Sequence, residues 1–170
     1  MDFRIEPVAE HHVEGLHAAL DSIAREKHYL TMYEAPPLED SRKFYLGNIK
    51  NGVPALVCIA DGKVIGWCDL NMAGNRPALA HHATVGMGII DGYREKGIGT
   101  ALLATLIEAA KKKGLRHLYL EVYENNTRAR ALYRKLGFIE TGRKPKFFLN
   151  GKGSYDDSIM MWLPLQDAGG

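Results

Sequence analysis

The chain has 170 residues, a length that suits one domain with its own hydrophobic core. Its composition is ordinary for a globular protein, with 46% hydrophobic residues, 25% charged residues and a formal net charge of only +2. This balance predicts neither a nucleic-acid partner nor attraction to an anionic membrane surface. No apolar run approaches the length of a membrane span, and the N-terminal residues lack the apolar segment of a secretory signal. We therefore expect a soluble, cytoplasmic protein.

The cysteines and histidines give no sign of a metal site. Cys58 and Cys68 fall inside predicted strands and match no metal-binding spacing, so buried reduced thiols are expected rather than a disulfide. His11, His12 and His17 lie on the first predicted helix without an accompanying cysteine or carboxylate pattern. We expect these histidines to be solvated or packed, and we expect no metal.

The first half of the chain predicts two helices and a β-hairpin. Apolar residues recur at three- and four-residue intervals after a short initial strand, and again after the Pro36-Pro37 pair, which cannot continue a helix. The Asp61-Gly62 pair between two apolar runs is a strong signal for a two-residue turn. In chain order, the predicted elements are a strand over residues 3–7, helices over residues 8–25 and 38–49, and hairpin strands over residues 53–60 and 63–71.

The stretch from Thr84 to Lys113 predicts a strand, a tight loop and a long helix. The strand covers residues 81–90, and the loop after it carries Arg94, Gly97 and Gly99, spaced as R-x-x-G-x-G where the helix begins. Helix N-termini present unpaired N–H groups and the positive end of the dipole, and glycines let a phosphate approach them closely. This stretch therefore predicts a pyrophosphate-binding site, and a strand beside such a ligand should be central in its sheet.

Two better-known phosphate motifs do not fit these residues. Counted from Gly92, a Walker A motif needs lysine where this chain has Ile98. The dinucleotide fingerprint needs a third glycine where this chain has Leu102. A simpler alternative is that the glycines only turn the chain into a packing helix. The neighbouring charges of Arg94 and Lys96 favour the phosphate site.

The second half of the chain predicts a parallel strand, a short helix and a final hairpin. A strand, a crossover helix and a second strand of this length form a right-handed parallel unit. Asn126 is a good N-cap and Gly137 a good stop residue for the next helix. The predicted elements are a strand over residues 116–123, a helix over residues 127–136, strands over residues 138–141, 146–149 and 158–163, and a frayed tail over residues 167–170.

A second motif, N-x-x-A-x-x-L-Y-x-x-x-G-F, runs from Asn126 to Phe138. Together with R-x-x-G-x-G, it resembles the GNAT superfamily of acyl-CoA-dependent N-acetyltransferases, most specifically over residues 84–142. The resemblance implies an α/β (α+β) fold with a single GNAT domain over residues 1–166. It also implies a central mixed, mostly antiparallel twisted sheet of about six to seven strands, flanked by about four helices.

The same resemblance implies that acetyl-CoA is the cosubstrate. The glycine-bearing loop would bind its pyrophosphate, and the backbone of the preceding strand would bond the pantetheine arm in a gap beside the next strand. Asn126 would contact the cofactor, a role compatible with a simple helix cap. The cofactor-binding residues expected in this way are Met87, Gly88, Ile89, Arg94, Glu95, Lys96, Gly97, Ile98, Gly99, Thr100, Asn126 and Ala129.

Tyr133 is the predicted catalytic residue. It stands at the motif position where many GNAT enzymes keep the acid that protonates the departing thiolate. A thiol pKa of about 8.5 and a phenol pKa of about 10 make this proton transfer nearly balanced. The alternative is a core tyrosine, because Ala129, Leu132 and Leu136 share its helix face.

The general base is not fixed by the sequence. Many GNAT enzymes carry a carboxylate on the strand before the phosphate loop, but residues 81–90 contain none. An ammonium group with a pKa of about 10.4 must still lose a proton before it attacks. The candidates, which the sequence does not separate, are His81, His82, Glu34, Asp69 and Glu121.

The acceptor is expected to be a small amine or an amino-acid-like molecule. The segment from Gly151 to Met160 resembles the G-x-Y-x-D-x-x-M ending of bacterial GNAT enzymes that act on such substrates, and Asp156 or Asp157 would attract a cationic amine unless both are solvated turn residues. Residues 26–37 would form either an acceptor wall or a plain surface loop. Alternatives are acetylation of peptide N-termini or lysines, a non-catalytic CoA-binding module and a nucleotide-binding regulator. GNAT proteins are often dimers, so a homodimer is also an expectation.

Overall fold

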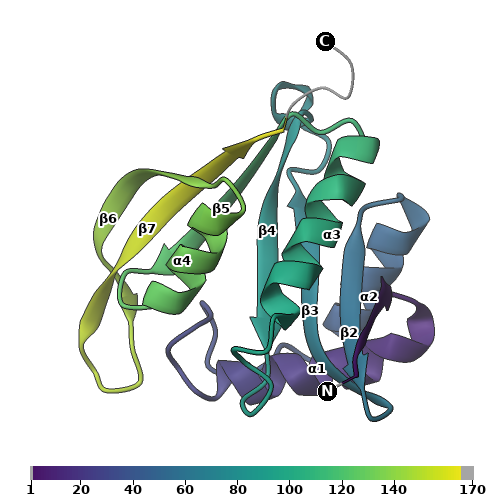
Figure 1. Cartoon of the computed structure of the whole chain (residues 1–170), viewed down its shortest axis with the longest axis horizontal. Coiled ribbons are helices and arrows are strands. Elements are labelled where there is room, and N and C mark those ends of the chain that lie inside the picture. Colours follow the sequence, from purple (N-terminus) through teal and green to yellow (C-terminus); the bar gives the residue numbers. More distant parts are fainter. Residues whose placement is uncertain (1, 166–170) are drawn as a thin grey trace.

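A single mixed sheet in the order β1-β2-β3-β4-β5-β7-β6 organises the computed structural model, which describes residues 2–165 (Figure 1). The tail predicted over residues 167–170 lies outside this range. Within the described residues, the fold class expected from the sequence is confirmed. The strands are β1 (Arg4–Pro7), β2 (Ala55–Ala60), β3 (Lys63–Met72), β4 (His82–Ile89), β5 (His117–Tyr123), β6 (Ile139–Leu149) and β7 (Tyr155–Pro164).

Helices cover both faces of this sheet. Helices α3 and α4 lie on one face, and α1 and α2 lie on the other (Figure 1). The first turn of the predicted helix over residues 8–25 is a separate 3-10 turn in the structure. The helices are η1 (Glu10–His12), α1 (Val13–Ala24), α2 (Leu38–Lys50), η2 (Pro77–Leu79), α3 (Ile98–Lys112) and α4 (Thr127–Lys135).

The turn between β2 and β3 has the geometry that its sequence predicts. Asp61 and Gly62 both have positive φ, 49° and 72°, as a two-residue hairpin turn requires. The strands then pair in antiparallel register from Ala60 opposite Lys63. The predicted hairpin is therefore confirmed.

Strand β4 occupies the middle of the sheet, as expected for a strand beside a ligand. It pairs antiparallel with β3 over all but its first residue, from Ala83 to Ile89. Its other neighbour, β5, runs parallel to it but pairs only at His82, Ala83 and Thr84. Beyond Thr84 the two strands diverge, so the second edge of β4 carries no ladder hydrogen bonds.

The C-terminal hairpin is longer than predicted. The two short strands expected over residues 138–141 and 146–149 form one strand, β6, which pairs with β7 through two register shifts. Bulges of this kind break the period-two pattern that marks a strand in sequence. Most of β6 is exposed, and Pro145 is tolerated because β6 is an edge strand. The separation into two strands was therefore wrong.

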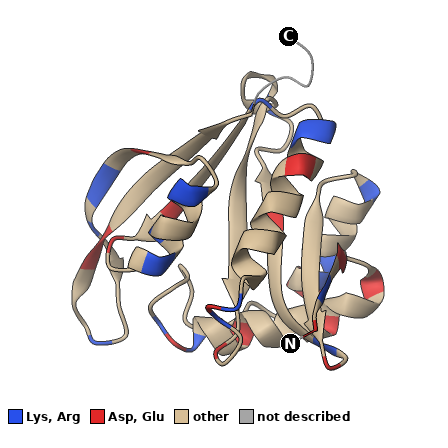
Figure 2. Cartoon of the chain, viewed as in Figure 1, with Lys and Arg blue, Asp and Glu red and all other residues tan. Residues whose placement is uncertain are grey.

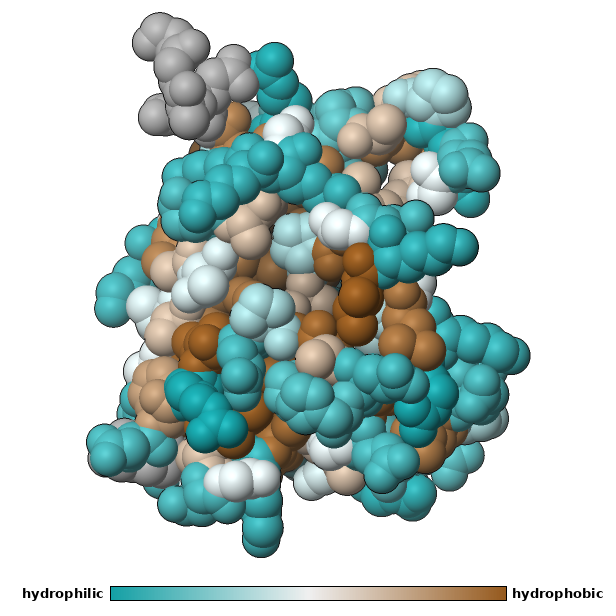
Figure 3. Space-filling model, turned by 90° about the vertical axis from the view of Figure 1, so that its right-hand side faces the viewer, coloured by the Kyte–Doolittle hydropathy of each residue, from teal (hydrophilic) through white to brown (hydrophobic). Residues whose placement is uncertain are grey.

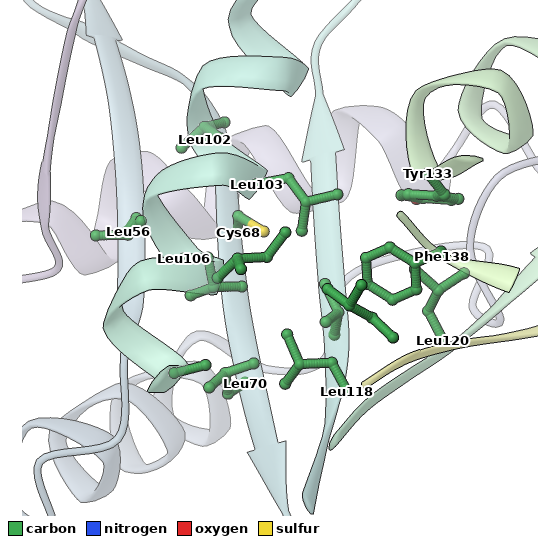
Figure 4. Close-up of a cluster of buried hydrophobic side chains, with 14 of the residues drawn as sticks. Leu56, Cys68, Leu70, Leu102, Leu103, Leu106, Leu118, Leu120, Tyr133 and Phe138 are labelled. Atoms are coloured by element: carbon green, nitrogen blue, oxygen red, sulfur yellow. The ribbon is translucent and has the colours of Figure 1, made fainter. Parts of the chain in front are cut away.

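The main core lies between α3 and the sheet. Leu102, Leu103 and Leu106 of α3 are fully buried and point toward side chains of β2, β3 and β5 (Figure 4). Cys58 and Cys68 are buried free thiols in this region, as predicted, and burial raises the pKa of Cys58 to about 11. On the other face, Trp67 packs in a smaller cluster with α1 and α2.

Charged residues of both signs are spread along the helices, the loops and the outer strands (Figure 2). Lys111 and Lys112 occupy the last turn of α3, where cations complement the helix dipole. Hydrophilic side chains also cover much of the face turned toward the viewer in Figure 3, leaving separate hydrophobic patches between them. None of the described helices is long and apolar enough to cross a membrane.

Replacing Leu103 with alanine tests the importance of the α3 core. Leu103 is fully buried, so the substitution should lower the free energy of unfolding by about 2–5 kcal/mol. Ile49→Ala is a matched control because Ile49 is 46% exposed, and it should change stability by less than about 0.5 kcal/mol. Urea unfolding followed by circular dichroism measures both values. Equal losses in the two variants would contradict this description of the core.

Candidate active site

The loop between β4 and α3 has the backbone geometry of an anion site. Gly92, Glu95 and Gly97 have positive φ values of 80°, 62° and 80°, and Gly97 is the N-cap of α3. None of the backbone N–H groups from Arg94 to Thr100 donates a hydrogen bond to another described residue. Alternating backbone conformations of this kind gather N–H groups into a concave nest, and the helix dipole adds positive potential.

Arg94 lines this region, but its charge is already partnered. Its guanidinium forms two hydrogen bonds with the Glu26 carboxylate and a third, of 2.9 Å, with the backbone oxygen of Ile89. It also lies 4.6 Å from the ring centroid of Tyr29. Glu26 raises the pKa of Arg94. The sequence predicted a cation for the phosphate, whereas the structure shows an ion pair that joins the loop to the segment after α1.

The other loop side chains have different roles. The Lys96 ammonium donates to the backbone oxygen of Gly92 at 2.7 Å, and Lys96 does not line the cleft described below. Ile98 points into the core and is 1% exposed, so only its backbone could meet a ligand. Glu95 pairs with Arg128 at 3.2 Å on the wall of the cleft.

A cleft of about 1030 Å³ runs from this loop past the place where β4 and β5 diverge. Its volume is at the upper end of the range of about 300–1,000 Å³ that is usual for small-molecule and cofactor sites. Of the residues predicted to bind the cofactor or to act in catalysis, those lining the cleft are Met87, Gly88, Ile89, Arg94, Glu95, Gly97, Gly99, Thr100, Asn126, Ala129 and Tyr133.

Glycines allow the elements around the cleft to approach one another. A Cβ at Gly88 would lie 2.5 Å from the Trp67 ring, and one at Gly99 would lie 3.0 Å from Leu132. At Gly88 the space that a Cβ would need is filled by the Trp67 and Ile23 side chains. The free edge of β4 over Met87–Ile89 remains open to the cleft.

Tyr133 belongs both to the core and to the cleft. It projects from α4 beside Phe138, is 8% exposed and lines the cleft (Figure 4). Among residues 2–165, nothing hydrogen-bonds to its hydroxyl. Burial raises the pKa of its phenol well above the ordinary value. The phenol therefore stays protonated at neutral pH, and its pKa lies further from that of a free thiol than the reference values suggest.

Asn126 caps α4, as its sequence position predicts. Its side-chain oxygen accepts a hydrogen bond of 3.2 Å from the backbone N–H of Ala129. Both residues line the cleft, so the cap and the predicted cofactor contact remain compatible.

The structure separates the five candidate bases. Asp69 and Glu121 line the cleft, whereas Glu34, His81 and His82 do not. Glu34 is exposed beside Arg25, and the two histidines pack against each other at the opposite end of β4 from the loop. Only the two carboxylates are therefore placed to receive a proton from a ligand in the cleft.

The two cleft carboxylates differ in their partners. Glu121 uses one oxygen for Lys144, at 2.6 Å, and the other for the Ser158 hydroxyl, at 2.9 Å. Asp69 accepts a hydrogen bond of 2.7 Å from the Tyr45 hydroxyl on one oxygen only. Burial raises the pKa of Asp69 to about 6, although the bond from Tyr45 opposes this rise. No sequence motif pointed to Tyr45, Lys144 or Ser158, because these contacts join distant parts of the chain.

The segment after α1 closes one end of the cleft. The Tyr33 hydroxyl donates to the backbone oxygen of Leu149, and the Gly151 N–H donates to the oxygen of Lys27 at 3.0 Å. Both contacts reach the hairpin of β6 and β7. The Tyr123 hydroxyl donates to the oxygen of Leu30 at 3.1 Å. Tyr29, Leu30, Met32 and Pro36 line the cleft, so residues 26–37 are not a plain surface loop, and an acceptor wall stays a prediction.

Asp156 and Asp157 have structural partners. Asp156 accepts hydrogen bonds from Asn125 and Asn150, at 3.1 and 2.8 Å. Asp157 accepts a hydrogen bond of 2.8 Å from the backbone N–H of Lys146 and pairs with Arg143 at 3.1 Å. Neither lines the cleft, so these carboxylates shape the hairpin, and the expected attraction to a cationic amine does not fit their positions.

Of the three histidines near the start of the chain, His11 is exposed, whereas His12 and His17 have local hydrogen bonds. The ring nitrogen Nδ1 of His12 accepts from the N–H of Ala9 at 3.0 Å, and His17 contacts the oxygen of Pro36 at 2.7 Å. In the part of the chain that the structure describes, no group of three or more His, Cys, Asp or Glu side chains could hold a metal ion.

Comparison with known proteins identifies the family. The model of the acetyltransferase (GNAT) family matches residues 16–138. An N-alpha-acetyltransferase from Sulfurisphaera tokodaii is 31% identical over 131 residues, which cover 72% of this chain and 76% of the relative. The chain therefore belongs to the acetyltransferase (GNAT) family.

Two further relatives extend the comparison. The [ribosomal protein bS18]-alanine N-acetyltransferase of Escherichia coli strain K12 is 40% identical over 73 residues. That match covers 43% of this chain and only 49% of the relative. The solved structure of a GNAT superfamily phosphinothricin acetyltransferase from Sinorhizobium meliloti, in complex with acetyl-CoA, superposes with a TM-score of 0.91. It is 21% identical and covers 100% of this chain and 92% of its own, which supports the fold assignment.

Gly97→Ala tests the anion site. The substituted residue must keep a positive φ at a cost of about 1–2 kcal/mol, so the loop should relax and weaken coenzyme A binding by about five- to thirtyfold. Gly114→Ala is a matched control, because Gly114 has a φ of 87°, has open space around it and lies at the other end of α3. Calorimetry should show weaker binding only for Gly97→Ala, while both variants lose stability. Unchanged coenzyme A affinity would contradict the assignment of the loop.

Proposed function

We propose that this chain transfers the acetyl group of acetyl-CoA to a small primary amine, with Tyr133 as the general acid. One observation carries the proposal: a single cleft joins the unpaired N–H groups of the loop, the free edge of β4 and Tyr133. These three parts match the needs of a diphosphate, an extended pantetheine arm and a leaving thiolate.

The cofactor would be held mainly by the backbone. The N–H groups from Arg94 to Thr100 are available to its pyrophosphate. The free edge of Met87–Ile89 offers amide and carbonyl groups to the pantetheine arm, as in the addition of a strand to a sheet. Held at both places, the thioester would lie in the gap between β4 and β5.

Tyr133 would protonate the sulfur when the carbon–sulfur bond breaks. Its buried phenol keeps its proton at neutral pH because its pKa is raised. Burial raises the pKa of a thiol for the same reason, as the Cys58 thiol shows. A thiolate formed in this cleft would therefore be a stronger base than free thiolate, which favours proton transfer from the phenol.

The closed end of the cleft favours a small acceptor. The contacts of Tyr33 with Leu149 and of Gly151 with Lys27 join the wall segment to the hairpin across this end. Tyr29, Leu30 and Met32 of the same segment line the cleft, together with Phe148. An extended peptide would have to separate these contacts, whereas a small amine would not.

A second candidate is acetylation of a protein N-terminus. Two of the relatives above are named as N-alpha or ribosomal-protein-alanine N-acetyltransferases. The match to the ribosomal-protein enzyme covers 49% of that relative. This candidate would require the wall segment of residues 26–37 to move away from the hairpin.

Tyr133→Phe tests the acid. Loss of the hydroxyl should lower kcat by about 10²-fold, because a general acid contributes about 10²–10⁴-fold. Coenzyme A affinity should be unchanged, since the ring remains. Tyr119→Phe is the control, as Tyr119 is 39% exposed and lies outside the cleft lining. Steady-state kinetics measures kcat for the two variants, and calorimetry measures their affinity for coenzyme A. Full turnover in Tyr133→Phe would exclude the acid role.

A screen of acceptors tests the substrate class. Amino acids, polyamines and short peptides with a free N-terminus are each incubated with acetyl-CoA, and the acetylated product and free thiol are measured. We expect kcat/KM to be at least about tenfold higher for a small amine than for any peptide. A preference for peptides would support the second candidate, and coenzyme A binding without transfer to any amine would indicate a non-catalytic module.

A further inference from the structure

The strand before the phosphate loop lacks a carboxylate, but the neighbouring strand supplies one at the same place. Asp69 on β3 pairs directly with Gly86 on β4. A Cβ built on Gly86 would lie only 2.8 Å from the Oδ1 atom of Asp69. The Asp69 carboxylate therefore occupies space that a side chain at position 86 would fill, next to the free edge of β4.

One oxygen of this carboxylate is fixed and the other is free. Oδ2 accepts the hydrogen bond from Tyr45, while Oδ1 accepts none from any described residue. Asp69 is 4% exposed and lines the cleft. Oδ1 keeps some solvent access, and a ligand that fills the cleft would remove it at an energetic cost unless the ligand offers a cation or a proton. An ammonium group in the cleft would satisfy that oxygen.

Asp69 and Tyr133 approach the cleft from opposite faces of the sheet. Successive residues of a strand point to opposite sides. Cys68 packs in the same core cluster as Tyr133, on the α3 side, whereas Asp69 points toward Tyr45 of α2. An amine could thus attack the thioester from the Asp69 side while the sulfur leaves on the Tyr133 side.

We propose that Asp69 is the general base of this enzyme, using Oδ1 to take the first proton from the acceptor ammonium. This inference rests on the proposed acetyl transfer to an amine. The neutral nitrogen then attacks the thioester carbonyl, the carbon–nitrogen bond forms and the carbon–sulfur bond breaks. The nitrogen loses two protons in all. The first passes through Asp69 to solvent. Tyr133 protonates the sulfur, and the second proton from the nitrogen returns the Tyr133 phenolate to its phenol form.

The surroundings of Asp69 suit this role. Burial raises its pKa to about 6, close to the range in which a base works at neutral pH. The titratable groups that interact with it are Tyr45 on α2 and Cys68 on its own strand. Its neighbours across the sheet, Ala55 on β2 and Gly86 on β4, carry no charge.

Glu121 is less suited, because both of its oxygens have partners. Lys144 and Ser158 bind them at 2.6 and 2.9 Å. A proton acceptor must have a lone pair within reach of the proton that it takes. Glu121→Gln is therefore the matched comparison for Asp69→Asn, since each variant replaces one cleft carboxylate with its amide.

The test is the pH dependence of kcat with the best amine from the screen. The wild type should lose activity as the pH falls through about 6, where Asp69 becomes protonated. Asp69→Asn should lack this acidic limb and lose about 10²-fold in kcat, with coenzyme A affinity unchanged. The hydrogen bond from Tyr45 stabilises the ionised carboxylate and lowers the pKa of Asp69, so Tyr45→Phe should raise that pKa and move the limb to higher pH. Glu121→Gln should keep the limb near its wild-type position.

Thermal unfolding separates a catalytic from a structural Asp69. Because the pKa of Asp69 is higher in the folded than in the unfolded chain, protonated Asp69 adds to the free energy of unfolding at low pH. This contribution is lost as the pH rises through about 6. Asp69→Asn should therefore be at least as stable as the wild type at pH near 8, whereas a purely structural carboxylate would make the variant less stable.

The possible failures can be told apart. If the wild type acetylates no amine, the proposed function is wrong, and this inference fails with it. If the wild type is active but Asp69→Asn keeps the acidic limb and a kcat within about threefold of wild type, only this inference is overturned. The inference would also be overturned if Glu121→Gln lost the acidic limb of the pH profile, or if Asp69→Asn lost coenzyme A binding.

Discussion

The divergence of β4 from β5 is the constraint on which the site depends. Three residue pairs join these strands, and the last is Thr84 opposite Tyr119. On their other edges, β4 stays paired with β3 up to Ile89, and β5 stays paired with β7 up to Tyr123. The sheet therefore opens between two halves in which neighbouring strands stay paired beside the opening. Unpaired backbone groups in this opening need a partner, and an extended ligand can provide it.

The sequence predicted the parts of the site that depend on local chemistry. The turn at Asp61-Gly62, the N-cap at Asn126 and the glycines of the phosphate loop are each set by a few neighbouring residues. The α3 stripe was also clear, because its period reflects one buried face. These features fixed the order of the elements and placed most of the predicted cofactor residues in one cleft.

The parts that were missed depend on tertiary contacts. Glu26 reaches Arg94 across 68 positions in the chain, and Tyr45 reaches Asp69 across 24. No local pattern encodes such a pair. The single long β6 was missed for a different reason, since its bulges and exposure remove the alternation that would mark it. Asp69 was one of five candidate bases in the sequence, and tertiary features distinguish it: it lines the cleft, it keeps one oxygen without a described partner, and it lies opposite Gly86.

Arg94 shows why glycines rather than cations would form the proposed phosphate site. A guanidinium has five N–H donors, and Glu26 and the Ile89 oxygen use three of those on Arg94. The remaining donors are available to a ligand, but the ion pair cancels most of the charge. Lys96 is also held, by the Gly92 oxygen. In the proposed site, attraction of a diphosphate to this loop would therefore rest on the oriented N–H groups and the dipole of α3, which require only the backbone conformation that Gly97 allows. Glu26 begins the segment that closes the other end of the cleft. The ion pair of Arg94 with Glu26 therefore connects the loop at one end of the cleft to the segment at the other end.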